Sequence, residues 1–189
     1  MVTLKLQVIR EVKKVGILQS LSHYHIILNQ LITAFIPKGQ EVVLHQLAFS
    51  DKPIYAFLDD KAALGLALVK AFELSGDVEY LLVARQMIIQ IEAFHTKRHS
   101  LFNFHSNQND TLIAPKFEIL DSVCPSANSM VCELYLWMGF LDANVAWTLQ
   151  GKDMLAAILE QAQANPIYFA NWLRIHSTWI ENPKAIIKF

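Results

Sequence analysis

The sequence is poor in cysteine. Cys124 and Cys132 are the only two cysteines among 189 residues, and they do not form a Cys-x-x-Cys pair. This spacing argues against a disulfide framework, a zinc knuckle and a thioredoxin-type redox motif. Because stable disulfides are rare in reducing compartments, a sequence without a disulfide pattern favours a cytoplasmic protein. The sequence indicates no metal site and no cofactor.

The sequence also lacks an excess of charge of one sign. Its 16 basic and 17 acidic residues are scattered along the chain and give a formal net charge of -1. Proteins that bind nucleic acid or an anionic membrane surface usually carry a basic patch or stripe. We therefore expect neither nucleic acid nor a membrane as a partner.

Long apolar runs are absent too, although the hydrophobic content is 53% and the mean hydropathy is +0.29. The longest apolar runs, residues 62–69 and 134–141, end well short of the roughly 20 residues that a membrane-spanning helix needs. Residues 1–16 alternate charged and apolar side chains without a compact apolar segment, so we expect no signal peptide. The apolar residues are therefore expected in a core or at an interface.

The sequence does have apolar residues at helical spacing along most of its length. This spacing predicts a helix over residues 4–15 and a second helix that follows Ser22 and ends before Pro37. The segment Glu41–Phe49 is β-branched at its start and roughly alternating, and it predicts a short strand.

The strongest helical pattern begins at residue 56. It predicts a helix over residues 56–74 that ends at Ser75-Gly76. Asp77 is a good N-cap for a second helix over residues 80–94, whose apolar side chains fall on one face. The two segments together predict a helical hairpin.

Shorter elements are expected after this hairpin. Residues 101–105 and 112–119 flank a turn-rich loop and predict a short β-hairpin. Ser126 follows Pro125 and is a good N-cap for a new helix that reaches Leu141. The remaining expected elements are a partner helix over residues 153–164, a last helix starting at Asn165-Pro166, and a closing strand in residues 185–189.

Two similar segments of the sequence indicate that the helices are organised in pairs. LSGDVEYLL at Leu74 and LQGKDMLAA at Leu149 both contain Leu-x-Gly. We expect each to mark the junction between the two helices of a hairpin. Stacked helix pairs bury their faces against neighbours, as in solenoids and toroids. The length suits one sizeable core, so we expect a single, mainly all-α domain over residues 1–189.

Four segments share their order and spacing with a known family. They are AFLDDKAALGLALVKAFELSGDVEYLLVA, FEILDSVCPSANSM, NPIYFANWL and the tail PKAIIKF. They resemble the C-terminal part of the spermatogenesis-associated, thioredoxin-domain-containing family, also known as the YyaL type. LDD followed by PS-x-NS is the most specific part. The resemblance covers residues 41–189, whereas residues 1–40 match less well.

The resemblance implies a fold. The family looks like a thioredoxin-like domain joined to an (α/α)6 toroid similar to six-hairpin glycosidases and N-acylglucosamine epimerases. Residues 41–189 would then form the last hairpins of an α/α toroid, with short β-hairpin insertions. The chain departs from the family at Lys61, where an aromatic residue is usual after LDD, and at Ala127, where Gly or Ser is usual. Both differences bear on the shape of a pocket and leave the carboxylates in place.

The toroid resemblance also suggests a binding site. Asp59 and Asp60 would begin one inner helix and residues 126–129 the next, so that their N-terminal ends face one cavity. Carboxylates, hydroxyls and an amide there would suit a sugar-like small molecule, and Trp172, Tyr168 or Phe117 could stack on its apolar face. The ligand-binding candidates are Asp59, Lys116, Glu118, Ser126, Asn128 and Trp172.

Catalysis needs more than binding. A glycoside hydrolase uses two carboxyl groups at a defined separation and with different pKa values, and Asp60 and Asp121 are the candidate pair. The same residues are also common as helix caps and turn residues, so a purely structural role stays open.

His95 and His99 lie four residues apart at a helix end, without a third residue at metal-ligand spacing. Cys124 lies near a helix N-terminus, without a convincing histidine partner for nucleophilic catalysis.

The sequence supports three hypotheses about function. The first is an α/α-toroid module that binds a carbohydrate-like ligand or another protein. Its exposed apolar faces would predict a homo-oligomer or a partner chain. The second is a carbohydrate-active enzyme, either a glycoside hydrolase or a sugar epimerase, that uses Asp60 and Asp121. The third is the remnant of a split or degraded gene.

Overall fold

The computed structural model describes residues 26–33, 36, 45, 55–96, 99–105 and 116–181, and these residues fold mainly into helices. The all-α prediction is therefore confirmed. The α-helices after residue 55 are α3 (Leu58–Ser75), α4 (Val78–Ile91), α5 (Ala127–Leu141), α6 (Val145–Ala164) and α7 (Ala170–His176). Short 3-10 turns, η1 (Glu92–Phe94) and η2 (Pro166–Tyr168), and a π-helical turn, η3 (Ser177–Glu181), accompany them. Residues 26–33 are also helical, within the range predicted for the second helix.

Some predicted elements lie outside the described residues. These are the helix over residues 4–15, the strand over 41–49 apart from its residue 45, and the closing strand over 185–189. None of the helices in the described ranges has the length and apolar character to cross a lipid bilayer.

The first hairpin, α3 and α4, follows the prediction closely. Gly76 ends α3 in the left-handed conformation, with φ 72°, and its N–H donates to the carbonyl of Phe72 at 2.8 Å. Glycine adopts this conformation without the steric cost that a side chain would bring. The carboxylate of Asp77 then accepts a hydrogen bond from the N–H of Glu79 at 3.0 Å and caps α4. The bounds differ slightly from the prediction, because α3 spans Leu58–Ser75, and α4 begins at Val78 and becomes a 3-10 turn after Ile91.

The second hairpin, α5 and α6, differs from the prediction in one respect. Helix α6 begins at Val145, capped by the side chain of Asn144, and not at residue 153. Leu-x-Gly at Leu149 therefore lies inside a helix, and the predicted equivalence with the junction at Leu74 is wrong. Gly151 has a packing role instead, because a Cβ there would lie 2.7 Å from Cγ of Leu136 on α5.

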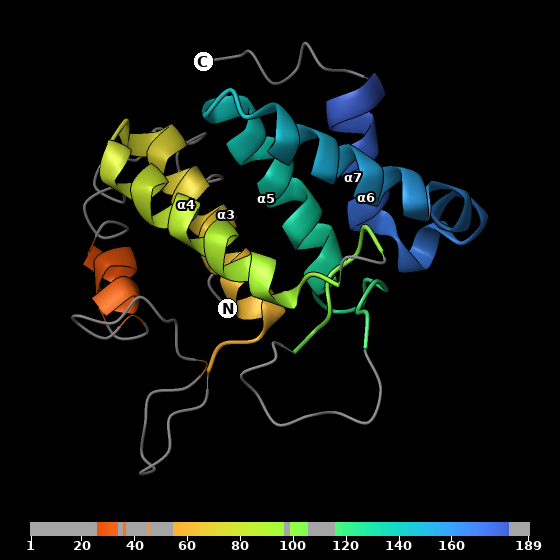
Figure 1. Cartoon of the computed structure of the whole chain (residues 1–189), viewed down its shortest axis with the longest axis horizontal. Helices are drawn as coiled ribbons and strands as arrows, with labels where there is room; N and C mark the ends of the chain where they lie inside the picture. Colours follow the sequence, from red (N-terminus) through yellow and green to blue (C-terminus); the bar gives the residue numbers. More distant parts are fainter. Residues whose placement is uncertain are drawn as a thin grey trace.

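The two hairpins pack together through their first helices. Helix α3 packs on α4, α5 packs on α6, and α3 and α5 contact each other (Figure 1). Only Glu133, Phe140 and Leu141 of α5 are not buried, so this helix forms the centre of the core. Its sequence is apolar on nearly every side, as expected for a helix surrounded by others. Helix α7 packs mainly on α6.

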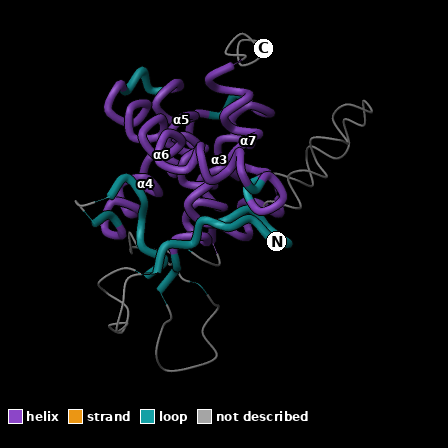
Figure 2. Tube along the Cα trace, turned by 90° about the vertical axis from the view of Figure 1, so that its right-hand side faces the viewer, coloured by secondary structure: helices purple, strands orange, loops and turns teal. Residues whose placement is uncertain are grey.

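No strand pair is present in the described part of the predicted β-hairpin, and residues 106–115 of that hairpin lie outside the described residues. Residues 101–105 contain an isolated antiparallel bridge between Phe102 and His95, and residues 116–119 have no regular structure. Figure 2 accordingly shows helices and loops without a strand in the described part. The backbone of Phe102 bonds to the side chain of Asn128 on α5, and the carbonyl of Phe104 accepts from the N–H of Leu58 at the start of α3, which positions the candidate site.

Candidate functional site

The N-terminal ends of α3 and α5 are joined by two intervening segments. The N–H of Leu58 donates to the carbonyl of Phe104 at 3.2 Å, and the N–H of Phe104 donates to the carbonyl of Lys116 at 2.8 Å. The N–H of Asn128, in the first turn of α5, donates to the carbonyl of Glu118 at 3.2 Å. These bonds bring the residues around Asp59 and the residues around Ser126 to one end of the molecule, called here the α3–α5 end.

Asn128 is fully buried and links three segments through its amide. Its Nδ2 donates to the carbonyl of Phe102 at 2.9 Å and to the carbonyl of Glu118 at 3.0 Å. Its Oδ1 accepts from the N–H of Phe102 at 2.8 Å. Because the amide uses both donor hydrogens and an acceptor position on the chain itself, Asn128 shapes the α3–α5 end and does not face a ligand.

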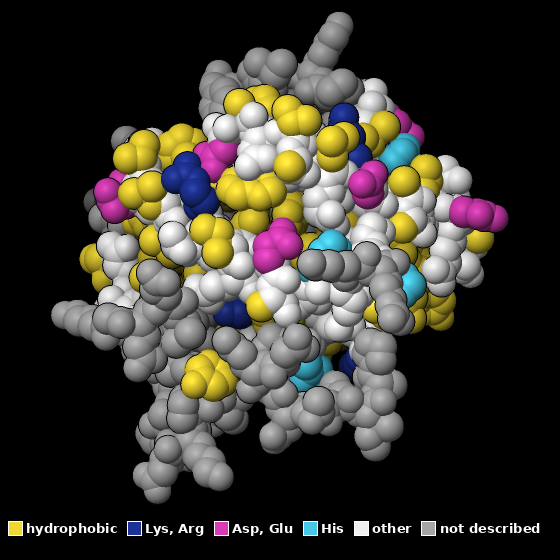
Figure 3. Space-filling model, viewed as in Figure 1, with side chains coloured by type: hydrophobic (Ala, Val, Ile, Leu, Met, Phe, Trp, Pro, Cys, Tyr) yellow, Lys and Arg dark blue, Asp and Glu magenta, His cyan; other side chains and the backbone are white. Residues whose placement is uncertain are grey.

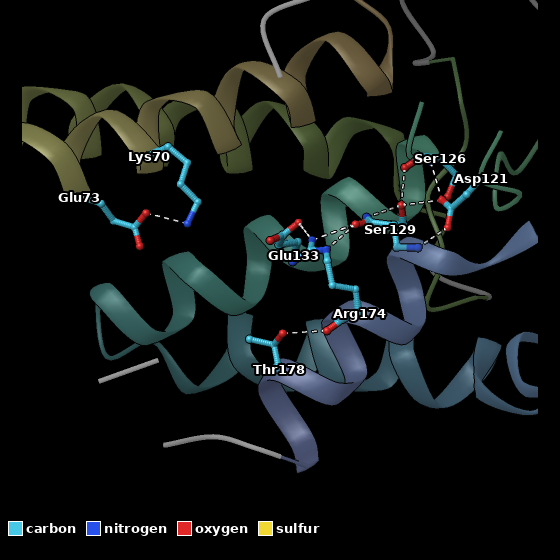
Figure 4. Close-up of polar contacts among 9 residues, drawn as sticks. Lys70, Glu73, Asp121, Ser126, Ser129, Glu133, Arg174 and Thr178 are labelled. Carbon is cyan, nitrogen blue, oxygen red and sulfur yellow. Dashed lines mark hydrogen bonds and ion pairs between the residues drawn. The ribbon is translucent and has the colours of Figure 1, made fainter. Parts of the chain in front are cut away.

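Asp121 lies beside the start of α5 and is almost buried, with 7% of its surface exposed. Its Oδ1 accepts hydrogen bonds from the N–H of Ser126 at 2.8 Å and from Oγ of Ser129 at 3.1 Å (Figure 4). Its Oδ2 accepts from the N–H of Asn171 at 2.8 Å. A carboxylate beside two helix N-termini satisfies N–H groups that would otherwise lack a partner. The contacts of Asp121 thus match the capping role.

Ser126 and Ser129 have different surroundings within this network. Ser129 donates toward Asp121 and accepts from Nδ2 of Asn171 at 2.9 Å. Ser126 occupies the N-cap position as predicted, but its side chain makes no cap hydrogen bond in the described structure. Its Oγ is buried and has no partner among the described residues.

Trp172 is buried and does not present a ring face to solvent. Its Nε1 donates to the carbonyl of Ile119 at 2.9 Å, which ties α7 to the segment before Asp121. Buried tryptophans usually pair their N–H in this way. The stacking role predicted for Trp172 would require it to leave this position.

Asp60 completes the N-terminal cap of α3. Its Oδ2 accepts from the N–H of Phe57 at 3.0 Å and lies 2.6 Å from Nδ1 of His45. The first contact is the backbone half of a capping box, in which an acidic side chain of the first turn reaches back to the residue before the helix. Oδ2 of Asp60 therefore contacts both the backbone N–H of Phe57 and the imidazole of His45.

Asp59 differs from Asp60 and Asp121 in its hydrogen bonding. Its Oδ1 is buried and has no hydrogen-bond partner within the part of the chain that the structure describes. Burial raises the pKa of Asp59, and the negative charges of Asp60 and Glu118 raise it further, against the opposing effect of the Asp60 N–H. An unsatisfied buried carboxylate oxygen is costly, so a donor that reached it would bind favourably.

The other two ligand candidates, Lys116 and Glu118, lie on the segment between the helices. Nζ of Lys116, an exposed residue, lies 5.2 Å from the ring centroid of Phe104, within cation–π range. Glu118 is half-buried and acts electrostatically on Asp59. The structure thus groups Asp59, Asp60, Lys116 and Glu118 near the start of α3, and Asp121, Ser126, Asn128 and Trp172 in the network at the start of α5.

Lys61 follows Asp60 in α3, and the sequence patterns did not single it out as a ligand contact. It is 7% exposed, and its Nζ donates to Oε1 of Gln90 on α4 at 2.5 Å. Burial lowers the pKa of Lys61 to about 8, although the charge of Asp60 opposes this shift. A signal was present in the sequence, because Lys61 is a charged residue directly before the apolar run of residues 62–69.

The histidines and cysteines do not assemble into a reactive group. Within the described ranges, no three His, Cys, Asp or Glu side chains are placed to hold a metal ion. Nε2 of His95 lies 2.9 Å from the carbonyl oxygen of His99. Cys124 is exposed as a free thiol, and Cys132 is buried, with its pKa raised by burial.

Comparison of the sequence with models of known protein families finds no match, and comparison with curated proteins finds none either. The site's chemistry therefore has to be inferred from its own residues. Those residues provide a carboxylate-rich surface at the start of α3 and a closed hydrogen-bond network at the start of α5.

Proposed function

We propose that this chain is a binding module of the α/α-hairpin type that takes a hydroxyl-rich, carbohydrate-like ligand at the α3–α5 end. The packing of α3 against α5, each with its own partner helix, supports the toroid part of this proposal. The resemblance to the YyaL-type family remains part of the proposal, as the source of the toroid architecture.

The observation that carries the proposal is the unpaired Oδ1 of Asp59. Ligand hydroxyl groups donate hydrogen bonds, and carboxylates accept them more strongly than neutral oxygens do. A sugar hydroxyl that reached Asp59 would satisfy a buried acceptor whose partner is missing in the described structure. Glu118, whose charge acts on Asp59, would accept from a second hydroxyl of the same ligand.

The proposal assigns binding, and not hydrolysis or epimerisation, to these residues. Both oxygens of Asp121 already accept hydrogen bonds from Ser126, Ser129 and Asn171. A catalytic carboxyl group must have an oxygen free to reach the substrate, whereas both oxygens of Asp121 are occupied by groups of the chain itself. The contacts of Asp121 therefore favour the binding hypothesis over the enzyme hypothesis.

Charge suggests which ligands should bind best. Asp59, Asp60 and Glu118 place three carboxyl groups near the start of α3, against one ammonium group from Lys116. A ligand that carries an ammonium group beside its hydroxyls would gain from this charge, whereas a phosphate would be repelled. We expect amino sugars to bind more tightly than neutral sugars, and sugar phosphates to bind least.

A thermal-shift series tests the proposal. Ligand that binds only the folded chain raises its melting temperature. At a ligand concentration of 100 Kd, the free energy of unfolding rises by about 2.7 kcal/mol. We expect a saturable rise with amino sugars that is lost in Asp59→Asn and reduced in Glu118→Gln. Asp153→Asn, at an exposed position on α6, is the matched control and should respond like the unchanged chain.

Two results would contradict the proposal. One is an unchanged melting temperature with every amino sugar and neutral sugar in the series, from a chain that melts cooperatively. The other is a shift of equal size in Asp59→Asn and Asp153→Asn, which would put the ligand elsewhere.

A further inference from the structure

Lys61 is a buried lysine near the start of α3. It is 7% exposed, whereas Lys116 and Lys152 are exposed. Lysine is almost never buried in this way unless a group of opposite charge pairs with it. Figure 3 shows few Lys and Arg side chains on the face that it presents, in separate places among hydrophobic and uncharged groups. Burial therefore sets Lys61 apart from the lysines that lie in solvent.

The hydrogen-bond partner of Lys61 is a neutral amide. Its Nζ donates to Oε1 of Gln90 on α4 at 2.5 Å and lies 6.0 Å from the ring centroid of Phe94. Within the part of the chain that the structure describes, no carboxylate is paired with this ammonium group. Lys70 has the more usual arrangement, because its Nζ donates to Oε2 of Glu73 at 2.6 Å (Figure 4). Lys61 thus lacks the paired negative charge that would hold its proton.

These surroundings favour the neutral amine. Burial lowers the pKa of Lys61 to about 8, although the charge of Asp60 opposes this shift. At pH 7.5 roughly a quarter of the Lys61 side chains are then neutral, against about one in a thousand for a lysine with the ordinary pKa of 10.5. The neutral amine is the form that attacks a carbonyl carbon, and imine-forming lysines are activated by the same desolvation.

The amine lies close to the surface in spite of its burial. Gln90, which covers it, is half-buried and precedes Ile91, the last residue of α4. A small molecule that displaces the Gln90 amide would reach Nζ of Lys61 without a change in the backbone. Side chains near a surface exchange rotamers within nanoseconds, so this displacement is fast compared with covalent chemistry.

We propose that Lys61 is a covalent binding site for small aldehydes, which it holds as an imine between α3 and α4. The nitrogen of the neutral amine forms a bond to the carbonyl carbon, and the π electrons of the carbonyl move to its oxygen. This oxygen then leaves as water with the two hydrogens of the amine, and a C=N bond remains. The step is neither an oxidation nor a reduction and needs no other reactant.

The imine suits this position better than the ammonium group does. It is neutral, so the charge that the fold buries at Lys61 disappears when the imine forms. Its nitrogen is an acceptor, and the amide of Gln90 can donate to it from Nε2 once the amide has turned. Aldehydes fit better than ketones, because one substituent of the carbonyl carbon is a hydrogen atom.

Reductive trapping of the full chain tests the proposal. The chain is incubated at pH 7.5 with glyceraldehyde and cyanoborohydride, which reduces an imine to a stable secondary amine. Peptide mass spectrometry then gives the labelling rate of each lysine. From the neutral fractions, we expect Lys61 to be labelled about tenfold faster than Lys152 or more. In urea that unfolds the chain, the two lysines should be labelled at equal rates.

Substitutions separate the buried amine from the other lysines. Lys61→Met should remove the fast adduct, whereas Lys152→Met, at an exposed position on α6, should leave it unchanged. Gln90→Glu places a carboxylate beside the ammonium group and should slow the labelling of Lys61 about tenfold, since the charged form is then favoured. Gln90→Ala removes the cover and the hydrogen bond, and should not slow the labelling.

Three results would overturn the proposal. One is a folded chain in which Lys61 is labelled no faster than Lys152. The second is a preference for Lys61 that persists in the unfolded chain. The third is an equal loss of labelling in Gln90→Glu and Gln90→Ala, with a cooperative melt for both variants. None of these results depends on a ligand at the α3–α5 end, so the proposed sugar site and the aldehyde site can fail separately.

Discussion

Oδ2 of Asp121 accepts a hydrogen bond from the backbone N–H of Asn171 at 2.8 Å, across fifty residues of sequence. The other oxygen of the same carboxylate holds the first turn of α5 through Ser126 and Ser129. One side chain therefore caps α5 and fixes the start of α7 against it. The polar stretch around Pro125 is explained in large part by this connection, together with the amide bonds of Asn128.

Replacing Asp121 by asparagine should destabilise the fold. The substitution keeps one acceptor oxygen but turns an NH2 group toward an N–H or a hydroxyl that needs an acceptor. Hydrogen bonds to charged groups contribute about 1.5–3 kcal/mol each, and a buried group left without a partner adds to the loss. We expect the free energy of unfolding to fall by about 3 kcal/mol, measured by urea denaturation with an unchanged m-value.

Asp153→Asn is the control for this change, because Asp153 is exposed on α6. Surface substitutions of this kind usually change stability by less than about 0.5 kcal/mol. Equal, small effects at the two positions would show that the network around Asp121 does not stabilise the fold.

Local signals were sufficient to predict the first hairpin but not the second. Gly76 and Asp77 end one helix and cap the next through contacts within four residues, so the sequence around them is informative by itself. Helix α6 begins at Val145 and is capped by Asn144, whereas the sequence pattern placed a helix junction at Gly151. Gly151 resembles a break when only its neighbours in sequence are considered. Its role depends on Leu136 of α5, which no local pattern reveals.

The candidate site, too, could be predicted only where its contacts are local in sequence. Asp59 and Asp60 were correctly expected in the first turn of a helix because acidic residues favour that position. Asn171, which donates to Asp121, and Ile119, which accepts from Trp172, each lie about fifty residues from their partner, so these contacts could not be inferred from spacing. Residues 101–105 were expected to pair with residues 112–119, and one backbone bond of this kind is present, from the N–H of Phe104 to the carbonyl of Lys116. The backbone of Phe102 bonds to the Asn128 side chain, and the carbonyl of Phe104 accepts from the N–H of Leu58, which no local pattern reveals.

Glycine positions at helix contacts should differ in their tolerance of alanine. A Cβ at Gly139 would lie 2.7 Å from the backbone nitrogen of Thr148, which cannot move without shifting α6. A Cβ at Gly65 would lie 2.5 Å from Cδ2 of Leu134, the end of a flexible side chain. We expect Gly139→Ala to cost about 2–3 kcal/mol, in the range of overpacked cores, and Gly65→Ala to cost less.

Thermal and urea denaturation of the two alanine variants measure this difference. Gly76→Ala is a useful third variant, since Gly76 has a positive φ and open space around it, so its cost would report backbone strain alone. If Gly65→Ala proved more destabilising than Gly139→Ala, the close approach of α5 and α6 at Gly139 would not be rigid.

Removing the buried charge of Lys61 should stabilise the chain at neutral pH. Lys61→Met keeps the length of the side chain and loses the ammonium group, whose pKa is lowered by burial to about 8. Below that pKa the folded chain buries a charged ammonium group, which is unfavourable. As the pH rises from about 8 to 10.5, the folded chain loses this proton before the unfolded chain does, so the stability of the unchanged chain rises. We expect Lys61→Met to be more stable by about 2 kcal/mol at pH 7, after subtraction of the lost bond to Gln90.

This advantage should shrink as the pH rises through that window, because the unchanged chain then buries a neutral amine. Lys152→Met, at an exposed position on α6, should show no such pH dependence. An advantage of Lys61→Met that is constant from pH 7 to pH 10 would mean that packing, and not charge, explains it.

Asp59 should make the stability of the unchanged chain fall as the pH rises through the acidic range, opposite to the effect of Lys61. Its pKa is raised in the folded state by burial and by the charges of Asp60 and Glu118, so the folded chain holds this proton more tightly than the unfolded chain does. The resulting stabilisation is complete below the unfolded pKa of about 3.9 and is lost as the pH rises through the folded pKa. Asp59→Asn removes this titration. Relative to the unchanged chain, the variant should therefore gain stability as the pH rises from 3.5 to 7, as measured by urea denaturation across that range.

The stability of the control Asp153→Asn should change with pH in the same way as that of the unchanged chain. A difference between Asp59→Asn and the unchanged chain that does not vary with pH would show that Asp59 ionises as freely in the folded protein as in the unfolded one. The electrostatic basis for a ligand site at the start of α3 would then be lost.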